Sequence, residues 1–182
     1  MSENQRVRLS KQCLRESLIC LLQQKSIHKV SVRELCDAAQ INRTTFYKYY
    51  GSPYDLLADM EDEALARCHE HLGTIDSVNG NAAAKLHGLL TYAQDNLALF
   101  RLLINNPVDT SFLQRIINLP MIRQFFSEQM LTGYTQGELD YFYELIVNGA
   151  ISMVKCWINK KERETPEEMT ALLMKAISKL FA

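Results

Sequence analysis

Apolar residues recur every three or four positions along most of the chain, which is the spacing of one face of an α-helix. No segment alternates strictly between apolar and polar residues, as a half-buried β-strand would. The 182 residues include only 7 glycines and 4 prolines, which favours long helices. The pattern predicts an all-α protein with about nine helices after a polar arm of residues 1–7. The expected helices are 9–24, 32–39, 43–50, 53–71, 82–105, 109–118, 120–131, 136–160 and 166–180.

The segment from Ser31 to Tyr50 is predicted to form two short helices joined by a tight turn. Ser31 and Glu34 have the spacing of a capping box, in which each side chain accepts a hydrogen bond from the other residue's backbone N–H. Asn42 is placed to cap the second helix, whose first turn is polar and whose later residues are aromatic. A helix that enters the major groove by its N-terminus needs this distribution, because its first turn reaches the base edges. The segment therefore predicts a helix-turn-helix that binds double-stranded DNA.

Charge is distributed unevenly between the two parts of the chain. Residues 1–50 contain 9 Lys and Arg against 4 Asp and Glu, whereas residues 51–182 contain 11 against 17. A basic first part suits contact with phosphates, although chance unevenness on a solvated surface would look the same. We expect a DNA-binding domain over 1–52 and a ligand-binding and dimerisation domain over 53–182.

Several classes of protein are not expected from the motifs. There is no nucleophile elbow, no H-E-x-x-H and no phosphate loop, so the chain is not expected to be an enzyme. Cys68, His69 and His71 do not complete a zinc site, and no metal or cofactor is expected. Four of the five cysteines fall on apolar helix faces and are expected to be reduced core residues. With a polar N-terminus and no apolar run near the ~20 residues of a membrane span, we expect a cytoplasmic protein without membrane contact.

The motif resembles the tetracycline-repressor (TetR) family of bacterial regulators. The matching segments are S-V-R-E-L-C-D-A-A at 31–39, I-N-R-T-T-F-Y-K-Y-Y at 41–50 and S-P-Y-D-L-L at 52–57, after a basic first helix. They lie in about the first third of the chain. The C-terminal stretch 148–168 is similar to one subgroup of the family's ligand-binding domains. The resemblance implies a homodimer that binds a palindromic operator under the control of an unknown small-molecule effector. It suggests repression, though related proteins with this kind of body activate.

The second motif helix holds the residues predicted to read bases. Arginine can bridge guanine O6 and N7, and threonine can contact a thymine methyl, which points to Arg43, Thr44 and Thr45. By the resemblance, the hydroxyl of Tyr47 meets a phosphate, and Ser31 and Arg33 lie near the DNA backbone. Lys48 is placed for a phosphate or a base edge, and Arg6 and Arg8 are placed to follow the adjacent backbone. Phe46 and Tyr50 are expected in the core. The full predicted set is Arg6, Arg8, Ser31, Arg33, Arg43, Thr44, Thr45, Tyr47 and Lys48.

Two positions depart from the family pattern. Gln40 stands where the turn usually has glycine, so a non-glycine residue is expected in the left-handed conformation. Pro53 stands where the next helix commonly carries a lysine that helps to hold a phosphate. The free backbone amides at that helix start could bind the phosphate instead.

The second part of the chain carries two candidate surfaces. Its helices are rich in aromatic residues and methionine, which can enclose an apolar ligand cavity or form a filled core. The predicted ligand-lining residues are Tyr92, Phe100, Leu103, Met121, Phe125, Tyr134 and Phe142. The last two helices hold more apolar surface than a terminal hairpin needs, which predicts a two-fold, four-helix dimer interface. Their apolar residues are Tyr141, Leu145, Ile151, Val154, Ile158, Leu172, Leu173, Ile177, Leu180 and Phe181. The predicted interface residues are Ile151, Val154, Ile158, Leu173, Ile177 and Phe181.

The alternative function is a helical protein-interaction or ligand-carrier module that has kept the motif only as a fold. Pro53 and the net charge of −1 favour this alternative. A salt titration distinguishes the two, because a DNA-binding protein loses affinity steeply as salt releases it from phosphates.

Overall fold

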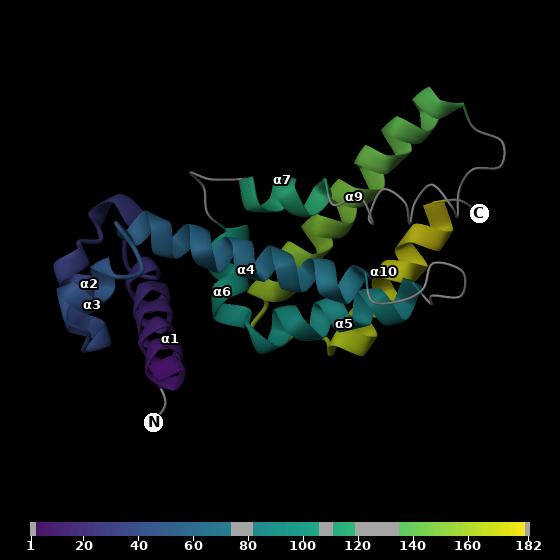
Figure 1. Cartoon of the computed structure of the whole chain (residues 1–182). Helices are drawn as coiled ribbons and strands as arrows, with labels where there is room; N and C mark the ends of the chain where they lie inside the picture. The colour runs from purple at the N-terminus through teal and green to yellow at the C-terminus, as the bar shows by residue number, and fades with distance from the viewer. Residues whose placement is uncertain (1–2, 74–81, 106–110, 119–134, 181–182) are drawn as a thin grey trace. The chain divides into compact units, whose positions relative to one another are not determined.

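The computed structural model describes residues 3–73, 82–105, 111–118 and 135–180 (Figure 1). These residues form nine α-helices and one 3₁₀ turn, with no strand among them, so the all-α prediction is confirmed. The helices are α1 (Glu3–Leu22), α2 (Val32–Ala39), α3 (Arg43–Tyr47), α4 (Pro53–Gly73), α5 (Ala82–Asp95), α6 (Leu97–Ile104), α7 (Ser111–Ile117), α9 (Gln136–Asn159) and α10 (Pro166–Leu180), and the 3₁₀ turn is Ile27–Lys29.

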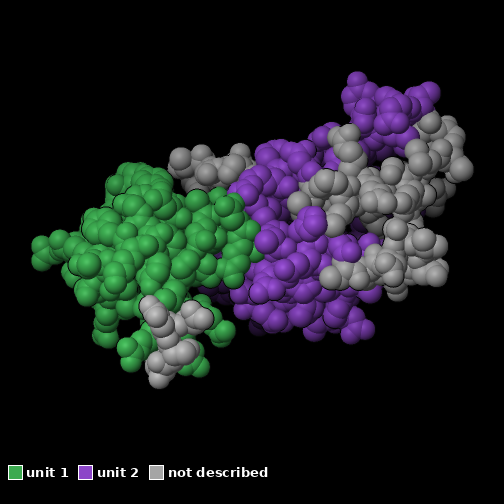
Figure 2. Space-filling model, viewed as in Figure 1, with its two compact units in different colours: residues 1–64 green, residues 65–182 purple. Residues whose placement is uncertain are grey.

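The chain divides into two compact units, residues 1–64 and residues 65–182, which we call the head and the body (Figure 2). The division falls inside α4, so one continuous helix contributes to both units. The predicted division at residues 52 and 53 concerns function, and it stays a prediction.

Three helix boundaries differ from the sequence prediction. Helix α1 already begins at Glu3, so residues 3–7 are helical and do not form a polar arm. Helix α3 ends at Tyr47, because the backbone N–H groups of Tyr49 and Tyr50 both bond to the carbonyl of Phe46 and close a turn. The helix expected over 82–105 is interrupted at Asn96, which has φ −115° and ψ 36°. Its side-chain amide donates to the carbonyl of residue 92 at 3.0 Å, a local bond that competes with the helix. The helix expected over 120–131 lies outside the described residues.

The core of the head joins all four of its helices. Leu14 and Leu18 of α1, Leu35 of α2, Phe46 of α3 and Leu56 of α4 have no accessible surface. Each of these residues lies on the apolar stripe that its helix was expected to bury. Because α3 is only five residues long, its position depends on burying Phe46 in this core.

The core of the body forms where α10 packs along α5 and α9 along α6. Trp157 is 1% exposed, and its indole N–H donates to the carbonyl of Glu164 at 2.8 Å, so its one polar atom is satisfied. The guanidinium Nε of Arg101 donates to the carbonyl of Ile158 at 2.9 Å and satisfies one of the last carbonyls of α9. Thr165 and Glu168 cap α10 reciprocally: the backbone N–H of Glu168 donates to the Thr165 hydroxyl, and the backbone N–H of Thr165 donates to the Glu168 carboxylate.

Candidate nucleic-acid interface

The turn between α2 and α3 is fixed by local hydrogen bonds. The Oγ of Ser31 accepts the backbone N–H of Glu34 at 3.2 Å and caps α2. Only this half of the expected capping box forms, because the Glu34 carboxylate pairs with Lys25 instead. At the other end of α2, Gln40 adopts φ 55° and ψ 36°. The expected left-handed residue is therefore present, at a cost of about 1–2 kcal/mol for a non-glycine side chain.

Helix α3 turns one side chain inward and several outward. The Oδ1 of Asn42 accepts the backbone N–H of Thr45 at 2.7 Å, which confirms Asn42 as the N-cap. Phe46 is fully buried, whereas the ring of its neighbour Tyr47 is 58% exposed and meets Phe46 edge-on, with 5.5 Å between centroids. The next outward residue, Lys48, is exposed. The anchor and the accessible side chains of α3 are thus neighbours in sequence with opposite environments.

All of the predicted DNA-contacting residues keep accessible surface. Thr45 is half-buried, and the other members of the set are exposed: Arg6, Arg8, Ser31, Arg33, Arg43, Thr44, Tyr47 and Lys48. Four of the exposed cations, Arg6, Arg8, Arg43 and Lys48, form no ion pair with any residue in the described part of the chain.

The remaining cations of the head are engaged to different degrees. Arg33 lies 3.7 Å from Asp37, but both side chains are more than 70% exposed, and water and salt weaken such a pair. Lys25 is paired with Glu34. The ammonium of Lys11 lies over the ring of Tyr50, 5.4 Å from its centroid.

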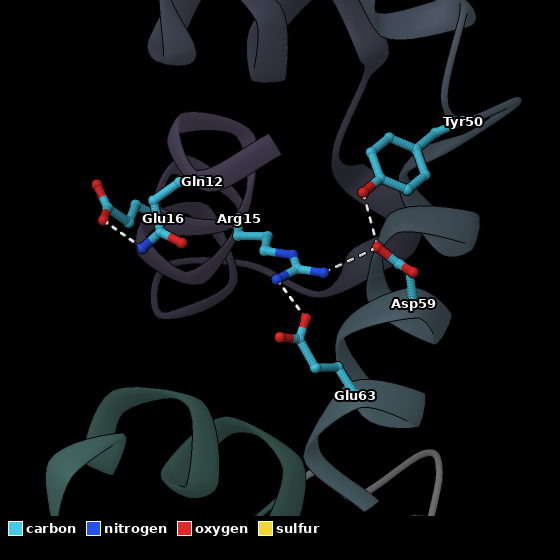
Figure 3. Close-up of polar contacts among 6 residues, drawn as sticks. All are labelled: Gln12, Arg15, Glu16, Tyr50, Asp59 and Glu63. Carbon is cyan, nitrogen blue, oxygen red and sulfur yellow. Dashed lines mark hydrogen bonds and ion pairs between the residues drawn. The ribbon is translucent and has the colours of Figure 1, made fainter. Parts of the chain in front are cut away.

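A polar cluster of the head ties the end of the motif to α4 (Figure 3). The hydroxyl of Tyr50 and the Nη2 of Arg15 both donate to the Oδ2 of Asp59, at 2.7 and 3.0 Å, and the Nη1 of Arg15 pairs with Glu63. Burial opposes ionisation of Asp59, but the hydrogen bonds from Tyr50 and Arg15 outweigh it and lower the pKa of the carboxyl group. Tyr50 is thereby held by its ring in the core and by its hydroxyl on α4.

The sequence reading did not find this cluster. Arg15 is 44 residues from Asp59, and no short motif relates them. The one available signal was Tyr50 itself, since a tyrosine expected in the core needs a partner for its hydroxyl.

The start of α4 is occupied by the helix's own carboxylate. The Oδ2 of Asp55 accepts the backbone N–H of Gly51 at 2.9 Å, and its Oδ1 accepts the hydroxyl of Ser52 at 3.0 Å. A negative charge at this helix start disfavours a second anion there. The Asp55 carboxylate therefore weakens the case for a phosphate at the free amides beside Pro53, which stays a prediction. The neighbouring Tyr54, which the sequence reading did not single out, is 51% exposed.

Several of the residues predicted to line a ligand site pack in the core of the body. Phe100 and Leu103 are buried in the core, with 3% and 2% exposure, and Tyr92 packs edge-on against Phe100. Phe142 packs on a buried cluster that includes Tyr143. The remaining members of the set, Met121, Phe125 and Tyr134, lie outside the described residues.

The described part of the body does contain an apolar cavity of about 160 Å³. Aliphatic side chains of α5, α9 and α10 form most of its wall, and Leu72 of α4 and Ile116 of α7 complete it. The wall includes Ile151, Val154, Leu173 and Ile177, which the sequence reading assigned to the dimer interface.

The sequence therefore did not show which apolar residues of α9 are buried in the protomer and which are exposed. Ile158 and Leu173 have 0% and 1% exposure, so they belong to the protomer's core and supply no surface to a partner. The exposed apolar residues of α9 and α10 are instead Tyr141 at 81%, Leu145 at 59% and Leu172 at 43%. Phe181 lies outside the described residues.

The cysteines and histidines do not build a site in the described residues. No group of three or more His, Cys, Asp or Glu side chains there is placed to hold a metal ion. Burial raises the pKa of the Cys68 thiol to about 12. Cys36 is also buried, but Cys20 and Cys156 are exposed, so the expectation of four core cysteines is wrong. None of the described helices is both long and apolar enough to cross a membrane.

Comparison with known proteins gives the same assignment from two parts of the chain. Residues 19–60 match the model of bacterial regulatory proteins of the tetR family, and residues 81–179 match a model described as a transcriptional regulator C-terminal region. A relative in Bacillus subtilis (strain 168), the uncharacterized HTH-type transcriptional regulator YxbF, is 18% identical over 172 residues, or 91% of this chain. The chain spans only 44% of the length of that relative.

Two solved structures share the fold. A TetR transcriptional regulator from Streptococcus agalactiae 2603V superposes with a TM-score of 0.67 at 18% identity, covering 96% of this chain and 97% of that one. The dihydroxyacetone kinase operon activator DhaS superposes with a TM-score of 0.64 at 16% identity, covering 94% of this chain and 95% of that one.

Proposed function

The chain belongs to the tetR family of bacterial regulatory proteins, a family of transcription regulators and not of enzymes, and we propose that it binds DNA as a homodimer on a palindromic operator. One observation carries the proposal. Helix α3 is capped by Asn42 and anchored by Phe46, and it leaves Arg43, Thr44 and Tyr47 accessible. This arrangement allows α3 to enter a major groove while its fold stays intact.

The accessible residues of the head divide by role. Arg43, Thr44 and Thr45 contact base edges, because they lie on the first turn of the recognition helix. The hydroxyl of Tyr47 and the ammonium of Lys48 contact phosphates, and the other members of the set, Arg6, Arg8, Ser31 and Arg33, follow the adjacent backbone. The exposed hydroxyl of Tyr54 is a substitute for the phosphate contact that Pro53 cannot make.

The dimer forms through α9 and α10. Tyr141, Leu145 and Leu172 are large apolar side chains that water would otherwise contact. Gly149 follows Leu145 by one turn of α9, and a Cβ added there would meet no atom within 4 Å. A two-fold contact of these helices with their copies buries this surface. It also presents two copies of α3 to successive major grooves, about 34–36 Å apart.

Self-association is tested by sedimentation equilibrium of Leu145→Glu. A buried, unpaired carboxylate is expected to shift the protein from dimer to monomer. Gln94→Glu adds the same charge on an exposed position of α5 and serves as the control. A wild-type protein that sediments as a monomer would refute the dimer.

An effector in the body acts through α4. This helix supplies Leu72 to the cavity wall, and in the head it supplies Asp59, which holds Tyr50 at the end of the motif. A ligand that binds one arrangement of α4 more tightly than another shifts the population of heads able to bind the operator. The shift cannot exceed the difference between its two affinities.

DNA binding is tested by a salt titration with a duplex taken from the intergenic DNA beside the gene. The observed affinity is expected to fall steeply and log-linearly with salt concentration. Arg43→Ala should weaken operator binding by about tenfold or more, since a bidentate base contact is worth about 1–3 kcal/mol. Tyr47→Phe should weaken binding to all sequences alike, and Thr44→Val should change the preferred sequence. Lys175→Ala, an exposed cation of α10, is the control.

The alternative function, a helical interaction or carrier module, predicts the opposite outcome. Asp55 at the start of α4 is the observation that favours it, because this carboxylate repels a phosphate. If the wild-type protein fails to bind duplex DNA even at low salt, the operator proposal is refuted and the interaction or carrier module is the function that is left.

A further inference from the structure

The cavity of the body is walled almost wholly by aliphatic side chains. Leu86 and Leu89 of α5 face Ile151 and Val154 of α9 and Ile177 of α10 across a space of about 160 Å³. A sugar, a nucleotide or another polyhydroxylated molecule would lose its hydrogen bonds to water here without replacement. The wall therefore selects a ligand whose body is apolar.

Among the described residues that line this wall, Lys85 is the only charged one. It lies one helical turn before Leu89 on α5 and is half-buried. Its side chain makes no ion pair or hydrogen bond with another residue in the described part of the chain. Lysines commonly rest their methylene stem on apolar surface and keep the ammonium at its edge. A single positive charge at the margin of an apolar space is a fixed point of attraction for one anionic group.

We propose that this cavity binds a small monocarboxylic acid, whose hydrocarbon part fills the space between α5, α9 and α10 and whose carboxylate pairs with the Nζ of Lys85. The role of the acid as the effector rests on the proposed function. Its binding depends only on the cavity. Charge-assisted hydrogen bonds between an ammonium and a carboxylate give the site its preference for acids over neutral molecules of the same shape.

The volume limits the length of the acid. A cavity of about 150 Å³ lined by aliphatic and aromatic side chains accommodates benzene. Benzoate and hexanoate match a space of 160 Å³, with the carboxylate reaching toward Lys85. Dodecanoate exceeds it and would have to expand the packing of α9 against α10, which close-packed interiors resist.

Binding is tested by isothermal titration calorimetry on the full chain without DNA. Benzoate and hexanoate are expected to bind more tightly than benzyl alcohol and hexan-1-ol, which have the same hydrocarbon parts without the charge. Lys85→Met keeps the stem and removes the charge, so it should weaken binding of both acids by about tenfold and leave the alcohols unchanged. Lys155→Met, at an exposed position of α9, should change neither.

Two further variants test the location of the site. Ala150→Leu and Val154→Phe place larger side chains in the cavity wall and should abolish binding of acids and alcohols together. Thermal unfolding shows whether each variant is folded. One folded variant of the two is sufficient for the test.

Each remaining outcome overturns the proposal. If neither acids nor alcohols bind, the cavity is not a ligand site. If Lys85→Met leaves the acid affinity unchanged, Lys85 only extends into solvent. If dodecanoate binds more tightly than hexanoate, or a folded cavity-filling variant still binds the acids, the ligand lies elsewhere. The salt titration with duplex DNA is independent of these results, so failure of the operator proposal is distinguished from failure of this one.

Discussion

The head and the body place their functional residues in opposite environments. In the head, the residues proposed to contact DNA are exposed, and their neighbours hold the fold: Phe46 is fully buried beside Tyr47, which is 58% exposed. In the body, Leu173 is 1% exposed and also lines the cavity. Function and fold are therefore carried by separate side chains in the head and by shared ones in the body.

This difference sets how each unit responds to change. The exposed residues of the head can be substituted one at a time without disturbing its core, so its specificity is free to vary. A substitution in the cavity wall changes the volume available to a ligand and the packing of α9 against α10 together. Stability and ligand choice are therefore coupled in the body.

The largest expected effects come from neighbouring residues of α3. Phe46→Ala should lower the free energy of unfolding by about 3–5 kcal/mol, because it leaves a cavity in the core of the head. Tyr47→Ala should change the stability by less than about 0.5 kcal/mol, as exposed substitutions usually do, while weakening DNA binding. Urea denaturation followed by circular dichroism measures both values. Similar losses of stability in the two variants would show that α3 does not separate fold from function.

Neighbouring residues of α10 provide the matching test in the body. Leu173→Ala should cost about 2–5 kcal/mol and also enlarge the cavity, so longer acids should bind better than they do to the wild type. Leu172→Ala should leave the stability nearly unchanged and weaken self-association, because Leu172 is 43% exposed. The fluorescence of Trp157, the single tryptophan, follows unfolding of the body. A Leu173→Ala protein that keeps its preference for short acids would show that the cavity wall does not select ligand length.

The same difference explains what the sequence could predict. The caps and the exposed residues of α2 and α3 follow from spacings of three to four residues, and Asn42, Phe46 and Gln40 lie as predicted. The cavity instead joins α5 to α9 and α10, which lie far from α5 in sequence. Both faces of α9 are apolar, and periodicity does not show which face turns inward. The choice of aromatic residues as ligand lining stays a prediction, because aromatic rings such as that of the buried Phe100 fill a core as readily as they line a cavity.

Substitution of Asp59 tests whether the head also contains a residue that affects both stability and function. Its pKa is lowered in the folded state, so its stabilising effect is complete above the unfolded pKa of about 3.9 and is lost as the pH falls through the lower, folded pKa. Asp59→Asn should cost about 1 kcal/mol at neutral pH, a modest value because 38% of the side chain is exposed. The variant should also lose part of the acid sensitivity of the head.

Amide hydrogen exchange between pH 3 and pH 7, resolved by peptide, localises this effect. Asp95→Asn, on an exposed position of the body, is the control and should leave the head unchanged. Exchange in α3 should rise in Asp59→Asn, because Tyr50 loses its charged partner. Equal exchange in the two variants would show that α4 does not restrain the end of the motif.

The smallest expected effect comes from Gln40, the one non-glycine residue with positive φ among the described residues. Its left-handed backbone costs about 1–2 kcal/mol, which Gln40→Gly removes. Glycine in turn adds about 0.5–1 kcal/mol of conformational entropy to the unfolded chain, so the net gain in stability should be about 0.5–1 kcal/mol. Gln40→Ala keeps the Cβ and should gain nothing, which makes it the matched control. Because Gln40 is exposed at the turn and makes no base contact in the proposal, operator preference should stay the same. A Gln40→Gly protein that is more stable but selects a different operator would show that the turn also sets how α3 meets DNA. Fold and function would then not be separate in the head at this residue.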